Sequence, residues 1–371
     1  MRKHIFKKRF CFLLFSCIFA LISCYNSPLS YLKIDIEDNE SSTESFENHD
    51  TSLFSFSSDF SGVESSSPNA MQIAERVSEG VKPTAEQLNN AITYKRIIIF
   101  GVDGAGGAFE KATCPNFDRI FSSGNVNYHG VSQYKTISGE NWCSMMYGVT
   151  AQTHNKTNNI ISETEHNDPS MPSVFKICTD YNPDMTFYSA VNWTPINYGL
   201  FENMDTLTKY SPRTIYPDLD SYKIDLKVFE SAKERIRNFN DSICFFHFDY
   251  VDAVGHIYGS ASEQYLNAIS FVDTLMGGIF DVCVESNKFE STLFVCVSDH
   301  GHSLMGGHGD ESEEEKTVTL AICGDRGNII KGSSEKYVTH DLASIILYAF
   351  GISQPNHFEG GVPKNLFNTL R

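Results

Sequence analysis

The chain has 371 residues and a formal net charge of -17, and 41% of its residues are hydrophobic. This length and composition are typical of a globular protein with one large or two small domains. The acidic balance argues against a nucleic-acid-binding surface, which needs clustered Lys and Arg. A small anionic substrate would therefore need positive charge from something other than side chains, and bound metal ions would supply it.

The N-terminus has the pattern of a targeting segment. Basic residues near the start precede a short apolar run, residues 10–23, which has the length of a signal peptide rather than of a full membrane span. The run ends in Leu21-Ile22-Ser23-Cys24, which resembles a bacterial lipobox with a lipid-bearing Cys24. We predict a signal peptide over residues 1–24 and an extracytoplasmic lipoprotein held at the membrane. A cleaved signal, giving a secreted protein, and an uncleaved anchor are the alternatives.

Composition changes after the signal peptide. Residues 25–68 are rich in Ser, Asp, Glu and Asn and bury too little apolar surface to fold, so we expect a flexible tether. Residues 69–94 predict one or two short helices that complete this segment, 25–94. A folded domain is expected over residues 95–371. Within it, the acidic run 311–315 is predicted to be a solvated loop.

The cysteines do not form a recognisable framework. Beyond residue 24 there are seven, an odd number, and none has the CxxC spacing of a zinc ribbon. Cys244 and Cys296 lie inside apolar runs, where a free cysteine behaves as a small buried hydrophobic residue. We expect few or no structural disulfides, although the predicted compartment would permit them.

Apolar runs alternate with helical patterns along the domain. The predicted strands cover residues 96–102, 185–191, 243–250 and 292–297, and the predicted helices cover residues 114–121, 173–179, 227–239, 265–286 and 338–350. Such alternation is typical of a parallel sheet covered on both faces. We therefore predict an α/β fold with a mostly parallel central sheet and helices on both faces.

Carboxylates stand at the ends of three predicted strands. Asp103, Asp252 and Asp299 lie at or just beyond the carboxyl ends of separate strands. Because these ends line one edge of an open parallel sheet, we expect the three side chains to converge. His256 follows Asp252 by four residues, and His300 directly follows Asp299, so imidazole joins carboxylate as a donor for a transition metal. A polar surface turn is the alternative for residues 298–310.

Further residues extend this candidate site. Residues 136–142 lead into a helix-like stretch, residues 143–147, and the hydroxyl of Ser138 near this helix start suggests a nucleophile beside the metal. Gly306 and Gly307 would let the chain fold back to bring in His308. His302 is either a supporting partner or a solvated loop residue. Trp142 either lines a leaving-group pocket or belongs to the core, the commoner place for an aromatic side chain.

These segments together resemble the alkaline phosphatase superfamily, specifically its type I phosphodiesterase and nucleotide pyrophosphatase branch. The resemblance covers most of the domain, and five segments match in order: Val102-Asp103-Gly104, residues 138–142 (SGENW), Asp252 with Gly255-His256, Asp299-His300-Gly301, and Gly307-His308-Gly309. Each segment is a weak signal alone, but their shared order is specific.

The resemblance implies two divalent metal ions, zinc in preference to manganese because the donors are rich in nitrogen. The residues it assigns are Asp252, His256 and His308 for one ion, and Asp103, Ser138, Asp299 and His300 for the other. Three carboxylates and a serine alkoxide carry four negative charges, which match two divalent cations. Paired ions about 4 Å apart can clamp the attacking and leaving oxygens of a phosphoryl displacement.

The resemblance also implies a mechanism, in which Ser138 attacks phosphorus and forms a phosphoserine that water hydrolyses. Backbone N–H groups at the helix start and the Asn141 side chain would donate to the phosphate oxygens. Many nucleotide-specific members have Thr where Ser138 stands, which weakens a narrow substrate assignment. The segment lacks the Cys/Ser-x-Pro-x-Arg pattern of formylglycine sulfatases. No Arg or Lys closely follows Ser138, whereas classical phosphomonoesterases hold the dianion with an arginine.

We therefore predict a metal-dependent phosphodiesterase or nucleotide pyrophosphatase that acts on a small phosphorylated substrate through a phosphoserine. One alternative is a phosphomonoesterase or phosphotransferase that uses the same site. Another is a non-catalytic surface binding protein that retains the fold.

Overall fold

The structure is a computed structural model that describes residues 67–213 and 220–370. The predicted signal peptide and nearly all of the predicted tether fall outside the described residues. Two short helices, α2 (Ala70–Glu75) and α3 (Ala85–Asn89), lie in the segment 69–94, and a capping box begins each of them. Val81, between them, pairs with Val362 near the C-terminus, so this segment contacts the domain.

A seven-stranded sheet in the order β2-β7-β6-β1-β5-β3-β4 forms the centre of the fold. The strands are β1 (Arg96–Val102), β2 (Asn125–Val131), β3 (Phe187–Val191), β4 (Leu207–Tyr210), β5 (Ile243–Phe248), β6 (Thr292–Val297) and β7 (Thr317–Gly324). Neighbouring strands from β6 through β4 pair in parallel, and β7 pairs antiparallel with both β6 and β2. The mostly parallel sheet is confirmed, and β2, β4 and β7 are strands that the apolar runs did not predict.

The central strands are apolar without interruption because both faces of the sheet are covered. Side chains alternate along β1: Ile97 and Ile99 face one core, and Ile98 and Phe100 face the other. All four are completely buried. The sheet therefore stands between two apolar layers.

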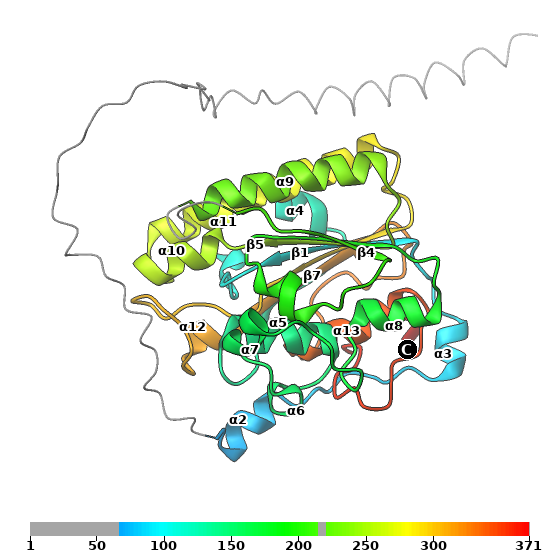
Figure 1. Cartoon of the computed structure of the whole chain (residues 1–371), viewed down its shortest axis with the longest axis horizontal. Helices are drawn as coiled ribbons and strands as arrows, with labels where there is room; N and C mark the ends of the chain where they lie inside the picture. The colour runs from blue at the N-terminus through cyan, green and yellow to red at the C-terminus, as the bar shows by residue number, and fades with distance from the viewer. Residues whose placement is uncertain (1–66, 214–219, 371) are drawn as a thin grey trace, which may run out of the picture. The chain divides into compact units, whose positions relative to one another are not determined.

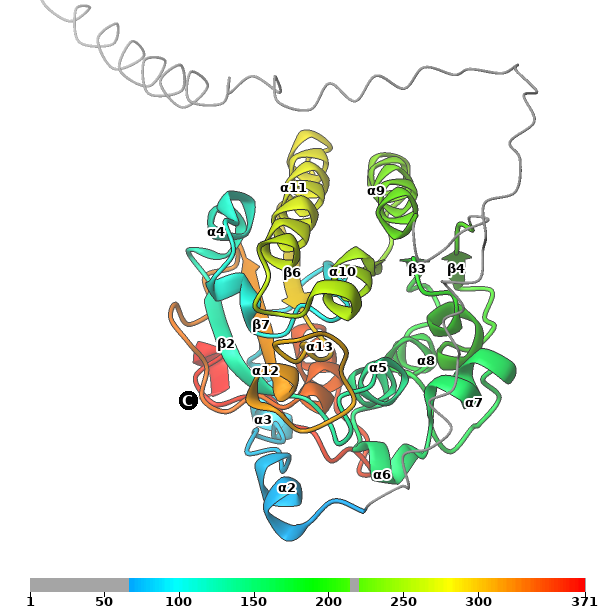
Figure 2. The same cartoon turned by 90° about the vertical axis from the view of Figure 1, so that its left-hand side faces the viewer.

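Helices cover both faces, as predicted (Figures 1 and 2). One core includes residues of α4 (Pro115–Phe121), α9 (Ser221–Asn238), α10 (Tyr250–Tyr258) and α11 (Glu263–Glu285). The other includes residues of α5 (Ser138–Tyr147), α7 (Asn158–Glu163), α8 (Val174–Tyr181) and α13 (Leu342–Ala349). Shorter elements complete the fold: η1 (Ala108–Glu110), α6 (Ala151–His154), η2 (Ile196–Leu200), α12 (Glu313–Lys316), η3 (Thr339–Asp341) and η4 (Asn368–Leu370).

The acidic run is not the solvated loop that its charge suggested. Residues 313–316 form α12, and Glu315 is buried, where its carboxylate accepts hydrogen bonds from the Ser312 hydroxyl and from Asp310 N. Glu311 pairs with Arg76 of the α2 segment at 2.6 Å. The prediction was wrong because these carboxylates have specific partners, which a count of charges does not reveal.

Two further features follow from burial. The seven cysteines of the described residues are all free and buried, in agreement with the absence of CxxC spacing. Helix α11 is long and apolar enough to cross a membrane, but 56% of its apolar window is buried inside the fold. Because α11 packs on the sheet through residues such as Ile269 and Met276, its apolar character is explained by the core.

Asp341 is a buried carboxylate that belongs to neither the predicted ligands nor the predicted nucleophile. It accepts hydrogen bonds from Gly361 N at 2.9 Å, from Val338 N at 3.1 Å and from the Ser78 hydroxyl. Burial, which outweighs these bonds, raises the pKa of Asp341 from 3.8 to about 6. The folded state therefore holds a proton on this group at pH values where the unfolded chain has lost it.

Wild-type stability relative to Asp341→Asn should accordingly fall as the pH rises from 4 to 7. The folded pKa is raised, so folding is favoured by protonation and this contribution is lost between roughly pH 4 and 6, by about 1–3 kcal/mol. Denaturant unfolding of both proteins at several pH values measures the difference. A difference that stays constant with pH would contradict the assignment.

Candidate active site

Three adjacent strands bring the predicted carboxylates to one edge of the sheet. Asp103 directly follows β1, Asp299 follows β6 by two residues, and α10, which begins one residue after Asp249 at the end of β5, carries Asp252 and His256. Since β6, β1 and β5 are neighbours, their carboxyl ends converge. The expected convergence is thus present in the structure.

Asp252, His256 and His308 form one group of potential ligands, with one donor atom of each within 4.8 Å of the others. Nε2 of His256 lies 3.3 Å from Asp252 Oδ2 and 3.2 Å from His308 Nε2. Nδ1 of His308 lies 2.7 Å from the carbonyl oxygen of Thr136, to which it donates. That tautomer leaves the lone pair of His308 Nε2 directed at the group, as metal-binding histidines require.

Asp103, Asp299 and His300 form a second group that meets the same distance limit. Ser138 Oγ lies beside it, 3.1 Å from His300 Nε2 and 3.4 Å from Asp103 Oδ1. Nδ1 of His300 is 3.0 Å from the carbonyl oxygen of Gly301 and donates to it, so the Nε2 lone pair faces Ser138. All seven predicted metal and nucleophile residues therefore lie in two adjoining groups.

The electrostatics of the two groups fit divalent cations. Burial and the charge of Asp103 raise the pKa of Asp299 well above its ordinary value. Asp299 Oδ2 is buried without a hydrogen bond, and burial lowers the pKa of neighbouring His300 to about 3, so this imidazole is neutral at neutral pH. Asp299 thus has no hydrogen-bond donor on Oδ2 and receives no positive charge from His300, and oxygen with imidazole nitrogen is a donor set suited to zinc.

Two side chains orient Asp103 from within the core. Trp142 Nε1 and His247 Nε2 each lie 2.9 Å from Asp103 Oδ2, which leaves Oδ1 directed to Ser138. Burial alone would raise the pKa of Asp103, but the hydrogen bond from His247 lowers it below the ordinary value. Trp142 is fully buried, so it belongs to the core and does not line a pocket. His247 was not predicted as a site residue, because it lies inside the apolar run of β5.

Asp249 is a further carboxylate that sequence reasoning passed over in favour of Asp252. Its position directly after β5 could have marked it as a candidate site residue. Its carboxylate forms a group with Asp103 and His247. Burial and the charge of Asp103 raise the pKa of Asp249 well above its ordinary value. Four carboxylates therefore meet at this edge of the sheet, where the sequence predicted three.

Asn141 does not have the predicted place. Its buried amide accepts from Gln133 N at 2.6 Å and donates to the carbonyl oxygens of Lys135 and Ile137 at 3.1 and 3.0 Å. These contacts do not support a hydrogen bond from Asn141 to a phosphate oxygen, because both ends of the amide are occupied. They fix the turn that precedes Ser138, the first residue of α5, so the helix begins five residues before the predicted start at residue 143.

The loop after β6 crosses from one group to the other. Gly306 and Gly307 have φ values of 111° and 77°, in the region that favours glycine, so the chain folds back as predicted and delivers His308. The rings of His300 and His308 stack with centroids 3.8 Å apart. One short loop thus supplies Asp299 and His300 to one group and His308 to the other.

The family model of type I phosphodiesterases and nucleotide pyrophosphatases matches residues 97–317, more than half of the chain. The chain belongs to this family. The matched region contains every residue of the two groups, and membership supports an enzyme of phosphoric ester chemistry in a superfamily that generally uses divalent metals.

Curated relatives are similar over a smaller part. GPI ethanolamine phosphate transferase 1 of Chaetomium globosum is 27% identical over 178 residues, which cover 39% of this chain and 19% of that protein. GPI ethanolamine phosphate transferase 2 of Schizosaccharomyces pombe is 24% identical over 144 residues, covering 38% and 19%. The chain therefore matches about a fifth of the length of these relatives.

Solved structures share the fold. A 2-O GAG sulfatase superposes with a TM-score of 0.58 at 12% identity, covering 72% of this chain and 73% of that one. Murine ectonucleotide pyrophosphatase/phosphodiesterase 5 gives a TM-score of 0.53 at 13% identity, covering 71% and 97%. These likenesses confirm an alkaline-phosphatase-like α/β fold.

If the two groups each hold an ion, single carboxylate variants should remove the ions separately. We expect about two zinc ions per wild-type chain and about one in Asp252→Asn and in Asp299→Asn, because each loses a ligand from one group only. Metal analysis after gel filtration measures the content. Asp180→Asn, which changes an exposed carboxylate paired with Lys176, is the matched control, and full zinc in either site variant would contradict the ligand assignment.

Proposed function

We propose that the domain cleaves a phosphodiester by transferring its phosphoryl group to Ser138. The observation that carries this proposal is the position of Ser138 Oγ, which lies at the start of a helix within 3.4 Å of both His300 and Asp103. When bound, two divalent ions held by the Asp252 and Asp103 groups would supply positive charge for the phosphate and for the ionised hydroxyl. The signal peptide and lipid anchor at Cys24 remain part of the proposal.

The chain's own residues then have distinct roles. The Ser138 hydroxyl loses its proton and attacks phosphorus, the bond to the leaving alcohol breaks, and that oxygen takes up a proton. His247 and Trp142 keep Asp103 turned towards Ser138, and Asn141 fixes the turn before it. In the second step an acceptor hydroxyl attacks the phosphoserine and releases Ser138.

The curated relatives favour an alcohol, rather than water, as the acceptor of the phosphoryl group. The curated relatives, which are similar to part of this chain, are named as ethanolamine phosphate transferases. A phosphotransferase reaction therefore has better support than the hydrolase first predicted, which differs only in using water as the acceptor. The lack of Arg or Lys close after Ser138 still favours diesters over dianionic monoesters.

Ser138→Ala should abolish turnover of a chromogenic phosphodiester, with a loss of at least about a thousandfold, because the covalent step needs this hydroxyl. The zinc-loaded full chain is assayed against bis(p-nitrophenyl) phosphate and p-nitrophenyl phosphate, with and without added ethanolamine as acceptor. Wild type should prefer the diester and turn over faster with the acceptor. Ser162→Ala, which changes an exposed serine of α7, is the control, and retained activity in Ser138→Ala would refute the nucleophile.

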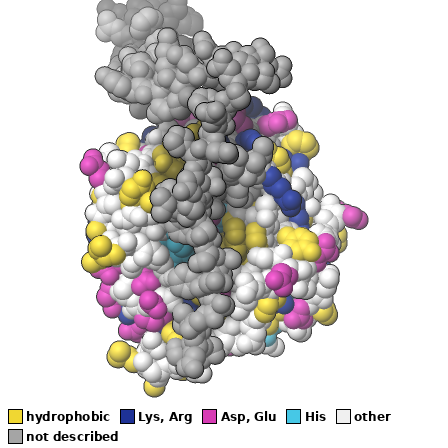
Figure 3. Space-filling model, turned by 60° about the vertical axis from the view of Figure 1, so that its left-hand side comes forward, with side chains coloured by type: hydrophobic (Ala, Val, Ile, Leu, Met, Phe, Trp, Pro, Cys, Tyr) yellow, Lys and Arg dark blue, Asp and Glu magenta, His cyan; other side chains and the backbone are white. Residues whose placement is uncertain are grey.

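Exposed apolar side chains flank the site. Ile257 and Tyr258 follow His256 at the end of α10, and Leu304 and Met305 lie in the loop before His308; they are 59%, 49%, 51% and 90% exposed. The two segments touch, since Ser260 N donates to Ser303 O at 3.0 Å. Figure 3 shows apolar side chains in separate patches on one face, with a histidine side chain exposed among them. We define these four residues as the apolar rim and propose that it contacts the lipid part of a phosphodiester substrate.

Substituting the rim should separate lipid from soluble substrates. Leu304→Ser with Met305→Ser should lower kcat/KM about tenfold for phosphatidylethanolamine in mixed micelles and leave turnover of bis(p-nitrophenyl) phosphate unchanged. A tenfold loss corresponds to about 1.4 kcal/mol, which is of the order expected when the apolar contact of these two partly exposed side chains is lost. Tyr181→Ser, an exposed apolar residue on α8, is the control. Equal effects on both substrates would exclude the rim as a lipid contact.

A further inference from the structure

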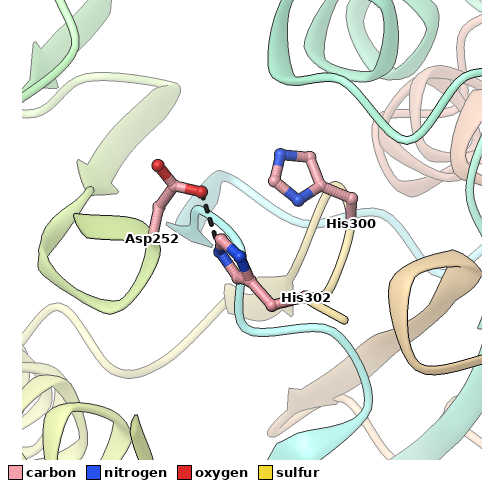
Figure 4. A group of neighbouring side chains, drawn as sticks. All are labelled: Asp252, His300 and His302. Atoms are coloured by element: carbon pink, nitrogen blue, oxygen red, sulfur yellow. Dashed lines mark hydrogen bonds and ion pairs between the residues drawn. The ribbon is translucent and has the colours of Figure 1, made fainter. Parts of the chain in front are cut away.

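His302 is a completely buried histidine that belongs to neither ligand assignment. It lies in the same loop as Asp299 and His300, and its Nε2 is 3.0 Å from Asp252 Oδ1 (Figure 4). The Asp252–His256–His308 group excludes His302, which instead groups with Asp252 and His300. His302 thus forms a hydrogen bond with the proposed metal ligand Asp252 but does not belong to the Asp252–His256–His308 group.

The ring of His302 packs against two glycines that have no side chain to displace it. A β-carbon at Gly255 would lie 2.3 Å from His302 Cδ2, and one at Gly104 would lie 2.7 Å from His302 Nε2. Tyr265 meets the ring edge-on with centroids 5.8 Å apart, and its hydroxyl donates to the carbonyl oxygen of Gly104 at 2.5 Å. The two glycines and Tyr265, which is fixed by its hydrogen bond to Gly104, therefore hold the imidazole in one position.

The hydrogen bonds of the ring define what it can do to Asp252. Nδ1 of His302 is buried without a hydrogen-bond partner, so Nε2 is the nitrogen that carries the proton and donates to Asp252 Oδ1. The other carboxylate oxygen, Oδ2, is the one that lies 3.3 Å from His256 Nε2. The bond from His302 therefore fixes the rotation of the carboxylate that presents Oδ2 to His256.

We propose that His302 is a positioning residue for Asp252, which strengthens zinc binding at the Asp252–His256–His308 group and leaves the Asp103 group unchanged. The inference rests on the proposed two-ion site. Removing a hydrogen-bond partner of a metal ligand typically costs 10–100-fold in metal affinity. Because Asp103 has its own orienting partners, His247 and Trp142, the effect should be confined to one ion.

The test measures zinc affinity of the full chain by competition with a fluorescent chelator. His302→Leu, which keeps an apolar side chain of similar size but no donor, should weaken one of the two zinc sites by about 10–100-fold. His302→Gln, which places a donor N–H near the position of Nε2, should stay within about threefold of wild type. His129→Ala changes an exposed histidine and is the control, expected to bind like wild type.

Gly255→Ala provides a second variant in case His302→Leu does not fold. It leaves His302 in the chain and displaces its ring, so it should weaken the same zinc site. Wild-type affinity at both sites in His302→Leu or in Gly255→Ala would overturn the proposal, as would equal weakening of both sites. Fewer than two zinc ions in wild type would instead refute the two-ion site on which the proposed function depends.

Discussion

The crowding of carboxylates at one edge of the sheet is the constraint on which the rest of the site depends. Asp103, Asp249, Asp252 and Asp299 meet where three parallel strands end, and burial raises the pKa of Asp249 and Asp299. Burying such groups together is costly unless a cation pairs with them. The neutral imidazole of His300 cannot supply that charge to Asp299, so the arrangement is consistent with a site built to hold divalent ions.

The surrounding core serves this edge by fixing directions. Backbone carbonyls set the tautomers of His300 and His308, and buried donors from Trp142, His247 and His302 hold the carboxylates. Asp103 receives both of its donors on Oδ2, which leaves Oδ1 to Ser138. The chemistry proposed for Ser138 therefore depends on residues that hold the ligand side chains in place.

The central strands and the carboxylates that follow them were predicted correctly from the sequence. Uninterrupted apolar runs identified the central strands, and the rule that ligand residues follow parallel strands located Asp103, Asp252 and Asp299. The edge strands were missed because β2 carries polar residues such as Asn125 and Asn127, whose bonds to distant loops justify their burial. Contacts of that kind depend on tertiary structure.

Tertiary contacts also explain why the roles of three site residues could not be predicted. His247 sits inside an apolar strand, and only its proximity to Asp103 reveals a role. His302 stood two residues from His300, but whether it faced solvent or Asp252 depended on the space left by Gly104 and Gly255. Asn141 followed the family motif, yet its amide is occupied by a turn that no spacing rule predicts.

We propose that two ions bind side by side, each with ligands from the loop after β6. Anomalous scattering at the zinc edge from crystals grown with zinc tests it most directly. We expect two peaks, one between Asp252, His256 and His308, and the other between Asp103, Asp299, His300 and the oxygen of Ser138. A single peak, or peaks away from both groups, would contradict the account.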